Sequence, residues 1–177
     1  MKKTAGVLTV VFIVMMSFAC KQRQEQKQPP VVYTPAAPPA QMQIDQYQAA
    51  VKQSPKSAPA WINLGDVLMD AQRFAEAIEA YDKALALDPK NVNVLVDQGT
   101  CYRGIGKFDK AVEMYQKAIK IDPKFPNAHR NLGVVLSIDL HKNAEGAKEF
   151  QKYLELKPDA HDAESIRQTI RQLEARK

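Results

Sequence analysis

The chain has 177 residues, of which 45% are hydrophobic and 25% charged, so it is long enough for one folded domain of ordinary size. Its formal net charge of +5 comes mostly from the N-terminal stretch, because residues 41–177 carry 20 lysines and arginines against 19 aspartates and glutamates. A nearly neutral folded part gives little support to nucleic-acid binding. A composition poor in glycine and rich in Ala, Lys, Gln and Leu favours helices over sheet.

Residues 1–19 have the layout of a signal peptide. Lys2 and Lys3 form a basic start, and residues 5–19 form an apolar run of fifteen, shorter than the roughly twenty residues that span a bilayer as a helix. Ala19 followed by Cys20 resembles the junction at which bacterial lipoproteins are cleaved and lipidated on the new N-terminal cysteine. The resemblance implies a lipid such as palmitate on Cys20, and a position at the bacterial envelope that faces the periplasm, with the outer membrane favoured. Ordinary secretion and an uncleaved signal anchor remain alternatives.

Residues 20–40 are expected to form a disordered tether rich in proline and glutamine. Five of the eleven prolines lie between Lys21 and Ala40, and the pairs Pro29–Pro30 and Pro38–Pro39 remove backbone donors and exclude helix. This composition predicts a semi-extended chain that would hold a folded module away from a membrane. A proline-rich ligand for another domain is the alternative interpretation.

A period of 34 residues runs through the rest of the chain. Gly65, Gly99 and Gly133 are 34 residues apart, and the same spacing separates Ala77 from Ala111, Tyr81 from Tyr115, Ala84 from Ala118 and Pro89 from Pro123. In the first unit, apolar and small residues recur at helical spacing on two successive helices. Such a period is the signature of a helix–turn–helix solenoid.

The order of these columns, with Trp, then Leu-Gly, then Ala, an aromatic residue, Ala and Pro, resembles the tetratricopeptide repeat (TPR). The resemblance covers residues 41–177 and implies an all-α, right-handed α-solenoid of about three TPR helix pairs. The units are expected at residues 58–91, 92–125 and 126–159, with a leading helix at 41–57 and a capping helix at 160–177. In the third unit Phe150 lies 35 residues after Tyr115, so the turn near Asp139 to Asn143 is expected to be irregular.

We find no sequence motif for catalysis, a cofactor or a metal, and the chain is predicted not to be an enzyme. His129, His141 and His161 lack zinc-ligand spacing, so structural or solvated roles are predicted for them. Cys101 lies between core positions and is predicted to be a buried, inert thiol. An enzyme would instead need a cluster of polar groove residues with perturbed titration.

The TPR resemblance further implies a groove lined by the first helix of each unit, which would take an extended peptide or a partner helix. By register, the groove residues are Ile62, Asp66 and Met69, then Val96, Thr100 and Arg103, then Arg130, Val134 and Ser137, flanked by Asn63, Asp97 and Asn131. Arg103 and Arg130 belong to no core column, so reversing both charges is expected to weaken binding and leave stability unchanged. Gly104 lies outside the glycine column, so alanine is expected to be tolerated there.

These features predict a protein–protein interaction scaffold, tethered to a membrane through its N-terminal lipid and aiding the assembly of an envelope complex. The expected partner is a protein or a peptide, and neither nucleic acid nor a small-molecule substrate is expected. A secreted or signal-anchored periplasmic TPR chaperone or oligomerisation module is the alternative.

Overall fold

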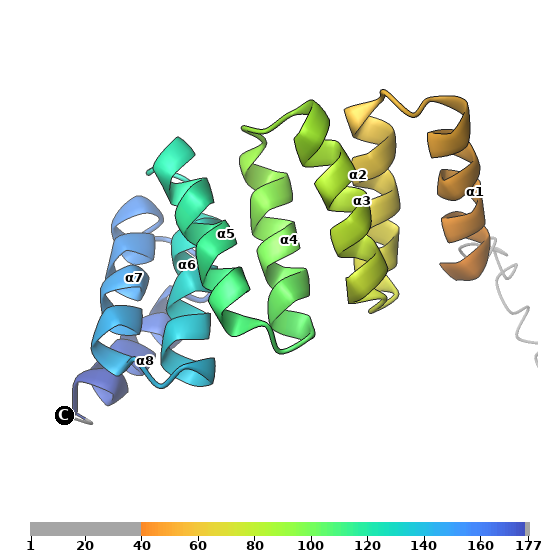
Figure 1. The fold of residues 1–177 in the computed structure, drawn as a ribbon. Coiled ribbons are helices and arrows are strands. Elements are labelled where there is room, and N and C mark those ends of the chain that lie inside the picture. Colours follow the sequence, from red (N-terminus) through yellow and green to blue (C-terminus); the bar gives the residue numbers. More distant parts are fainter. Residues whose placement is uncertain (1–39, 176–177) are drawn as a thin grey trace, which may run out of the picture. The chain divides into compact units, whose positions relative to one another are not determined.

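The computed structural model describes residues 40–175, so the predicted signal peptide, Cys20 and nearly all of the predicted tether lie outside the described residues. Within residues 40–175 the chain contains eight α-helices and one π-helical turn, with no strand, which confirms the all-α fold class (Figure 1). The helices are α1 (Ala40–Gln53), α2 (Ala58–Asp70), α3 (Phe74–Leu87), α4 (Val92–Gly104), α5 (Phe108–Ile121), α6 (Pro126–Val134), α7 (Asn143–Leu156) and α8 (Ala163–Ala175); the π-helical turn η1 spans Val135–Asp139.

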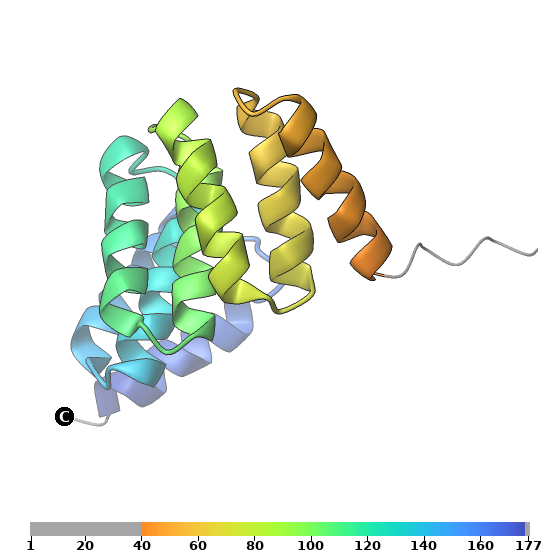
Figure 2. The same ribbon diagram turned by 45° about the vertical axis from the view of Figure 1, so that its right-hand side comes forward.

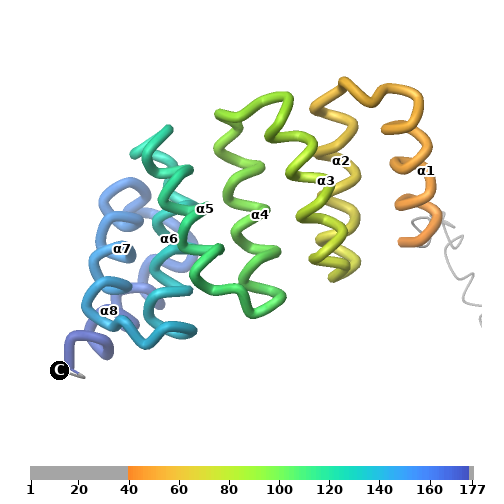
Figure 3. Tube along the Cα trace, viewed as in Figure 1, coloured from red at the N-terminus to blue at the C-terminus, as the bar shows by residue number. Residues whose placement is uncertain are grey.

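Neighbouring helices pack in chain order. Each predicted unit is a helix pair, α2 with α3, α4 with α5, and α6 with α7, while α1 packs on α2 and α8 packs on α7 (Figures 1 and 2). The Cα trace shows the pairs side by side along the array (Figure 3). Each unit therefore gains its burial from its neighbours in sequence, as expected of a solenoid. Within residues 40–175 no helix has both the length and the apolar character needed to cross a membrane.

The glycine column marks the place where the two helices of a unit come closest. A Cβ added to Gly65 would lie 2.4 Å from the ring of Tyr81, and one added to Gly99 would lie 2.6 Å from the ring of Tyr115. In the third unit a Cβ on Gly133 would lie 2.8 Å from the ring of Phe150. The period thus records one repeated contact, in which an aromatic ring on the second helix lies against bare backbone on the first.

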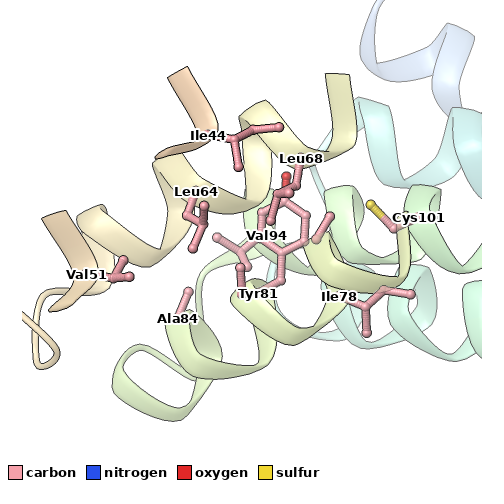
Figure 4. Close-up of a cluster of buried hydrophobic side chains, with 11 residues drawn as sticks. Ile44, Val51, Leu64, Leu68, Ile78, Tyr81, Ala84, Val94 and Cys101 are labelled. Carbon is pink, nitrogen blue, oxygen red and sulfur yellow. The ribbon is translucent and has the colours of Figure 1, made fainter. Parts of the chain in front are cut away.

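The buried ring of Tyr81 lies in a core that joins four helices (Figure 4). This core includes Ile44 and Val51 of α1, Leu64 and Leu68 of α2, Ile78 and Ala84 of α3, and Val94 and Cys101 of α4. Ile44 is only 1% exposed. The leading helix α1 is therefore an integral part of the array, and it begins at Ala40, a residue predicted to end the tether.

The extra residue of the third unit lies in a helix rather than in the turn. Along η1 the amide of Leu140 donates to the carbonyl of Val135 at 3.0 Å, a separation of five residues that widens the helix by one residue. The turn that follows matches the other two, because Gln72, Gly106 and His141 all have positive φ angles, of 58°, 73° and 55°. The expectation of an irregular turn near Asp139 to Asn143 is therefore corrected: the irregularity begins at Val135, and the turn itself is kept.

The π-helical turn also explains why glycine replaces alanine at position 146. A Cβ on Gly146 would lie 2.7 Å from the Cβ of Ser137 and 2.9 Å from the carbonyl oxygen of Gly133. The widened turn brings its backbone so close to α7 that no side chain fits between them.

Candidate functional site

The first helices of the units form one continuous face of the array. Helix α2 contacts α4, and α4 contacts α6, so residues of these three helices adjoin one another from unit to unit. We call this the groove face and define it by Ile62, Asp66, Met69, Val96, Asp97, Thr100, Arg103, Arg130, Asn131 and Val134. All of them are half-buried except Val96, which is 5% exposed and forms part of the floor.

Ser137, which the register places in the groove, does not belong to this face. Its side chain is 5% exposed and its hydroxyl donates to the carbonyl of Gly133 at 2.7 Å. The extra residue of η1 changes the direction of the helix surface at this point, so a count of 34 residues from Arg103 gives the wrong residue. A Cβ on Gly146 would lie 2.7 Å from the Cβ of Ser137, so Ser137 faces α7, and we leave it out of the groove face.

Four of the predicted groove residues meet in one depression between α4 and α6. Its lining consists of Thr100, Arg103, Tyr115, Arg130, Asn131 and Val134. The hydroxyls of Thr100 and Tyr115 are 3.2 Å apart, and the amide nitrogen of Asn131 is 3.5 Å from the Thr100 hydroxyl. A tyrosine hydroxyl is protonated at neutral pH, and burial raises the pKa of Tyr115 further, to about 12, so this hydroxyl remains available for hydrogen bonding.

Both groove arginines are held by carboxylates from the following part of the array. Arg103 donates to Asp139 of η1, and Arg130 donates through Nε to Asp162 at 2.7 Å. The two aspartates are 14% and 13% exposed, whereas each arginine keeps 38% of its side chain exposed. Fixed guanidinium groups that still reach solvent are oriented for a ligand at little further entropic cost.

Asp162 anchors Arg130 and also accepts a hydrogen bond from the Tyr153 hydroxyl at 2.7 Å. Burial alone would raise the pKa of Asp162, but the hydrogen bonds from Tyr153 and Arg130 outweigh burial and lower it below its ordinary value. The carboxylate is therefore ionised at neutral pH and keeps Arg130 in place.

A second depression adjoins the first and shares Arg130 and Asn131 with it. Its other lining residues are Val96, Asp97, Asn127, Tyr153, Lys157 and His161. The repeat register places Tyr115 in a core column and does not place Tyr153 in the groove. The signal that could have found them is the hydroxyl itself, because Phe150 in the same column as Tyr115 shows that packing alone does not require it.

Two carboxyl groups at the N-terminal end of the groove face have raised pKa values. Burial raises the pKa of Asp97 to about 6, and the charge of Asp66 adds to the effect. Burial also raises the pKa of Asp66, although the Tyr81 hydroxyl donates to its Oδ1 at 2.8 Å and opposes the shift. Neither carboxylate takes part in an ion pair within residues 40–175.

His129 and Cys101 hold buried positions that suit structural roles, whereas His141 and His161 are exposed. His129 is 6% exposed, with its Nδ1 2.7 Å from Glu149 and its Nε2 3.1 Å from the carbonyl oxygen of Pro123. Burial raises the pKa of the fully buried Cys101 thiol to about 12, which makes it unreactive. Across the part of the chain that the structure describes, no three His, Cys, Asp or Glu side chains are grouped so that they could hold a metal ion.

Family comparisons identify the same repeat. Two family models, both described as tetratricopeptide repeat, match residues 56–124 and residues 114–149. Residues 56–149 of the chain therefore contain tetratricopeptide repeats. A search of curated protein sequences found no match.

Solved TPR structures resemble this chain in fold. The match with a crystal structure of MamA covers 73% of this chain and 81% of the MamA chain, with a TM-score of 0.64 and 20% identity. The Arabidopsis OM64 TPR domain covers 65% and 94%, with a TM-score of 0.61 and 21% identity. The first TPR of Spaghetti (RPAP3), bound to the HSP90 peptide SRMEEVD, covers 67% and 93%, with a TM-score of 0.62 and 24% identity. At these identities the likeness establishes the fold alone.

Proposed function

We propose that this TPR protein is a non-enzymatic adaptor that binds a segment of a partner protein on its groove face. The observation that carries the proposal is the convergence of side chains from successive units on two adjoining depressions, which share Arg130 and Asn131. The depressions combine fixed arginines, hydroxyls and an amide with the apolar side chains of Val96 and Val134. Such a mixture suits an extended peptide or a helix, which offers backbone groups and side chains together.

One structural relative supports this reading of the groove. The Spaghetti TPR is seen bound to a peptide, SRMEEVD, so a TPR array with 24% identity to this one can hold a short protein segment. In the present chain, the salt bridges to Asp139 and Asp162 fix the two arginines before any partner arrives. A preformed site loses less side-chain freedom on binding than one that must order itself.

The raised pKa values of Asp66 and Asp97 call for a comparison with an enzyme. A general acid or base would need a second reactive group within hydrogen-bond reach. The side-chain partner of Asp66 is the Tyr81 hydroxyl, and within residues 40–175 no histidine or cysteine donates to either carboxylate. An interaction surface accounts for these carboxylates better than a reaction does.

Site-specific crosslinking in cells would test the groove. A photoreactive amino acid at Thr100 or Val134 should crosslink to a partner protein, because both residues line the first depression. The matched controls carry the same amino acid at Lys117 or Lys120, two exposed positions on α5. Crosslinks from the α5 positions and none from the groove would refute this location of the binding surface.

We further propose that Cys20 carries a lipid that tethers the protein to a bacterial membrane, with the outer membrane favoured, where it aids assembly of an envelope complex. The support is the basic, apolar and cysteine-terminated layout of residues 1–20. Replacing Cys20 by alanine should abolish incorporation of labelled fatty acid and release the protein from the membrane fraction. Unchanged incorporation would refute lipidation, and membrane retention without label would instead support an uncleaved anchor.

A periplasmic chaperone or oligomerisation module remains the second candidate, favoured if no lipid is found and the protein is released.

A further inference from the structure

The two ends of the groove face differ in how their charges are balanced. Toward the C-terminal end, Arg103 and Arg130 are each neutralised by an aspartate of this chain. Toward the N-terminal end, Asp66 of α2 and Asp97 of α4 have no cationic partner within residues 40–175. Arg130, Lys157 and His161 line the same depression as Asp97, but the Nε of Arg130 donates to Asp162, and none of the three forms an ion pair with Asp97. Asp66 and Asp97 are therefore available to pair with a cation from a partner.

The carboxylates at this end lie close enough to affect each other. Burial is the main cause of the raised pKa values of Asp97 and of the Tyr81 hydroxyl that lies against Asp66. The charge of Asp66 adds to the shift of Asp97, and the charges of both aspartates add to the shift of Tyr81. Like charges on the contacting helices α2 and α4 repel each other, and a cation bound near both carboxylates would reduce that repulsion.

Apolar side chains flank the same carboxylates. Ile62 and Met69 lie one turn before and about one turn after Asp66 on α2, and both are half-buried against the core. Val96 precedes Asp97 on α4 and forms part of the floor beside it. The two carboxylates thus lie beside partly buried apolar side chains, a combination that neither an acidic nor a purely apolar segment would complement.

From this charge balance we infer that the N-terminal end of the groove face binds a basic, amphipathic protein segment. Such a segment would present a lysine or arginine to Asp66 and Asp97 and an adjacent apolar side chain to Ile62 and Met69. The inference rests on the proposed function, because it specifies the chemistry of the partner that the groove takes. Complementary charge also selects among partners, since an acidic segment would meet two unpaired carboxylates there.

A random twelve-residue peptide library, selected on the full chain in detergent, tests the inference. Recovered peptides should be enriched in lysine or arginine next to apolar residues. A peptide from this set should bind the D66N/D97N variant at least about tenfold more weakly, and its binding to the unaltered chain should weaken as salt rises. The matched control, D109N/E113Q, removes the same charge from exposed positions of α5 and should bind as the unaltered chain does.

The outcomes separate the inference from the proposed function. Recovery of peptides with no basic preference, or of acidic peptides, would overturn the inference and leave the groove as a peptide site. Equal weakening in the control variant would also overturn it, because the effect would then come from overall charge. Failure to recover any peptide would overturn both. Circular dichroism of each variant establishes that it is folded, and a folded D66N/D97N variant that binds normally counts against the inference.

Discussion

Replacing Asp97 by asparagine should stabilise the fold at neutral pH, although it changes a residue of the proposed binding site. In the folded protein burial raises the pKa of Asp97 from 3.8 to about 6. The folded state therefore holds this proton more tightly than the unfolded state does. The stability that the protonated carboxyl contributes is fully present below pH 3.8 and is lost as pH rises through about 6.

The size of the effect follows from the difference between the two pKa values. At about 1.4 kcal/mol per pH unit, the difference corresponds to about 3 kcal/mol of unfolding free energy at most. Asp97 lines an open depression and is only half-buried, so solvent screens part of this cost. We expect the substitution to raise the unfolding free energy at pH 7.5 by roughly 1–2 kcal/mol.

Urea unfolding followed by circular dichroism, at pH 4.5 and pH 7.5, measures the effect directly. The unaltered chain and the D97N variant share all other titrating groups, so the difference between their pH dependences isolates Asp97. D109N, at an exposed position of α5, is the matched control and should change little. Destabilisation by D97N at pH 7.5, or a pH dependence equal to that of the unaltered chain, would refute the reasoning.

Two further predictions follow from contacts that the sequence does not reveal. Alanine at Gly104 should lower the free energy of unfolding by about 1–3 kcal/mol, and with it the melting temperature, because its Cβ would lie 2.7 Å from the ring of Phe74. A thermal melt equal to that of the unaltered chain would contradict this prediction. Gly99→Ala provides the comparison within the glycine column. Glutamate at Arg103 should also destabilise the fold, because it would face the partly buried Asp139. Glutamine at Arg103 should destabilise the fold less, because it carries no negative charge. Equal unfolding midpoints in urea for the two variants would show that the repulsion is absent.

Both predictions correct expectations drawn from the repeat register alone. Gly104 was expected to tolerate alanine because it lies outside the glycine column, yet it packs against an aromatic ring of the preceding unit. Arg103 and Arg130 were expected to be replaceable without loss of stability, yet each is held by an aspartate. A change of binding after charge reversal at these positions would therefore need to be separated from a change of folding.

The helix pairs could be predicted from the sequence because the period records one contact made again in each unit. Gly65 with Tyr81 and Gly99 with Tyr115 are the same glycine–aromatic contact, so matching columns in the sequence correspond to matching positions in the fold. Most of the groove residues follow from the same register, since positions on successive first helices adjoin one another.

The ion pairs of the groove could not be predicted in this way. Arg103 and Asp139 are 36 residues apart, and Arg130 and Asp162 are 32 apart, so neither pair falls on the 34-residue period. Asp139 reaches Arg103 from a π-helical turn, and the sequence shows only that the third unit has one residue more. A residue count gives the length of a unit but not the hydrogen bonds that absorb the extra residue. It therefore does not reveal that Ser137 faces α7.

The π-helical turn has a practical consequence for joining repeats. Because the extra residue is taken up before the turn, Gly133 still packs on Phe150, and α7 still presents its outer surface to α8. The chain after Lys142 is therefore in phase with an ordinary 34-residue unit. A further helix pair inserted between α7 and α8 would need no deletion to compensate for the extra residue of the third unit. The array could therefore be lengthened at this junction, although the unit before it is 35 residues long.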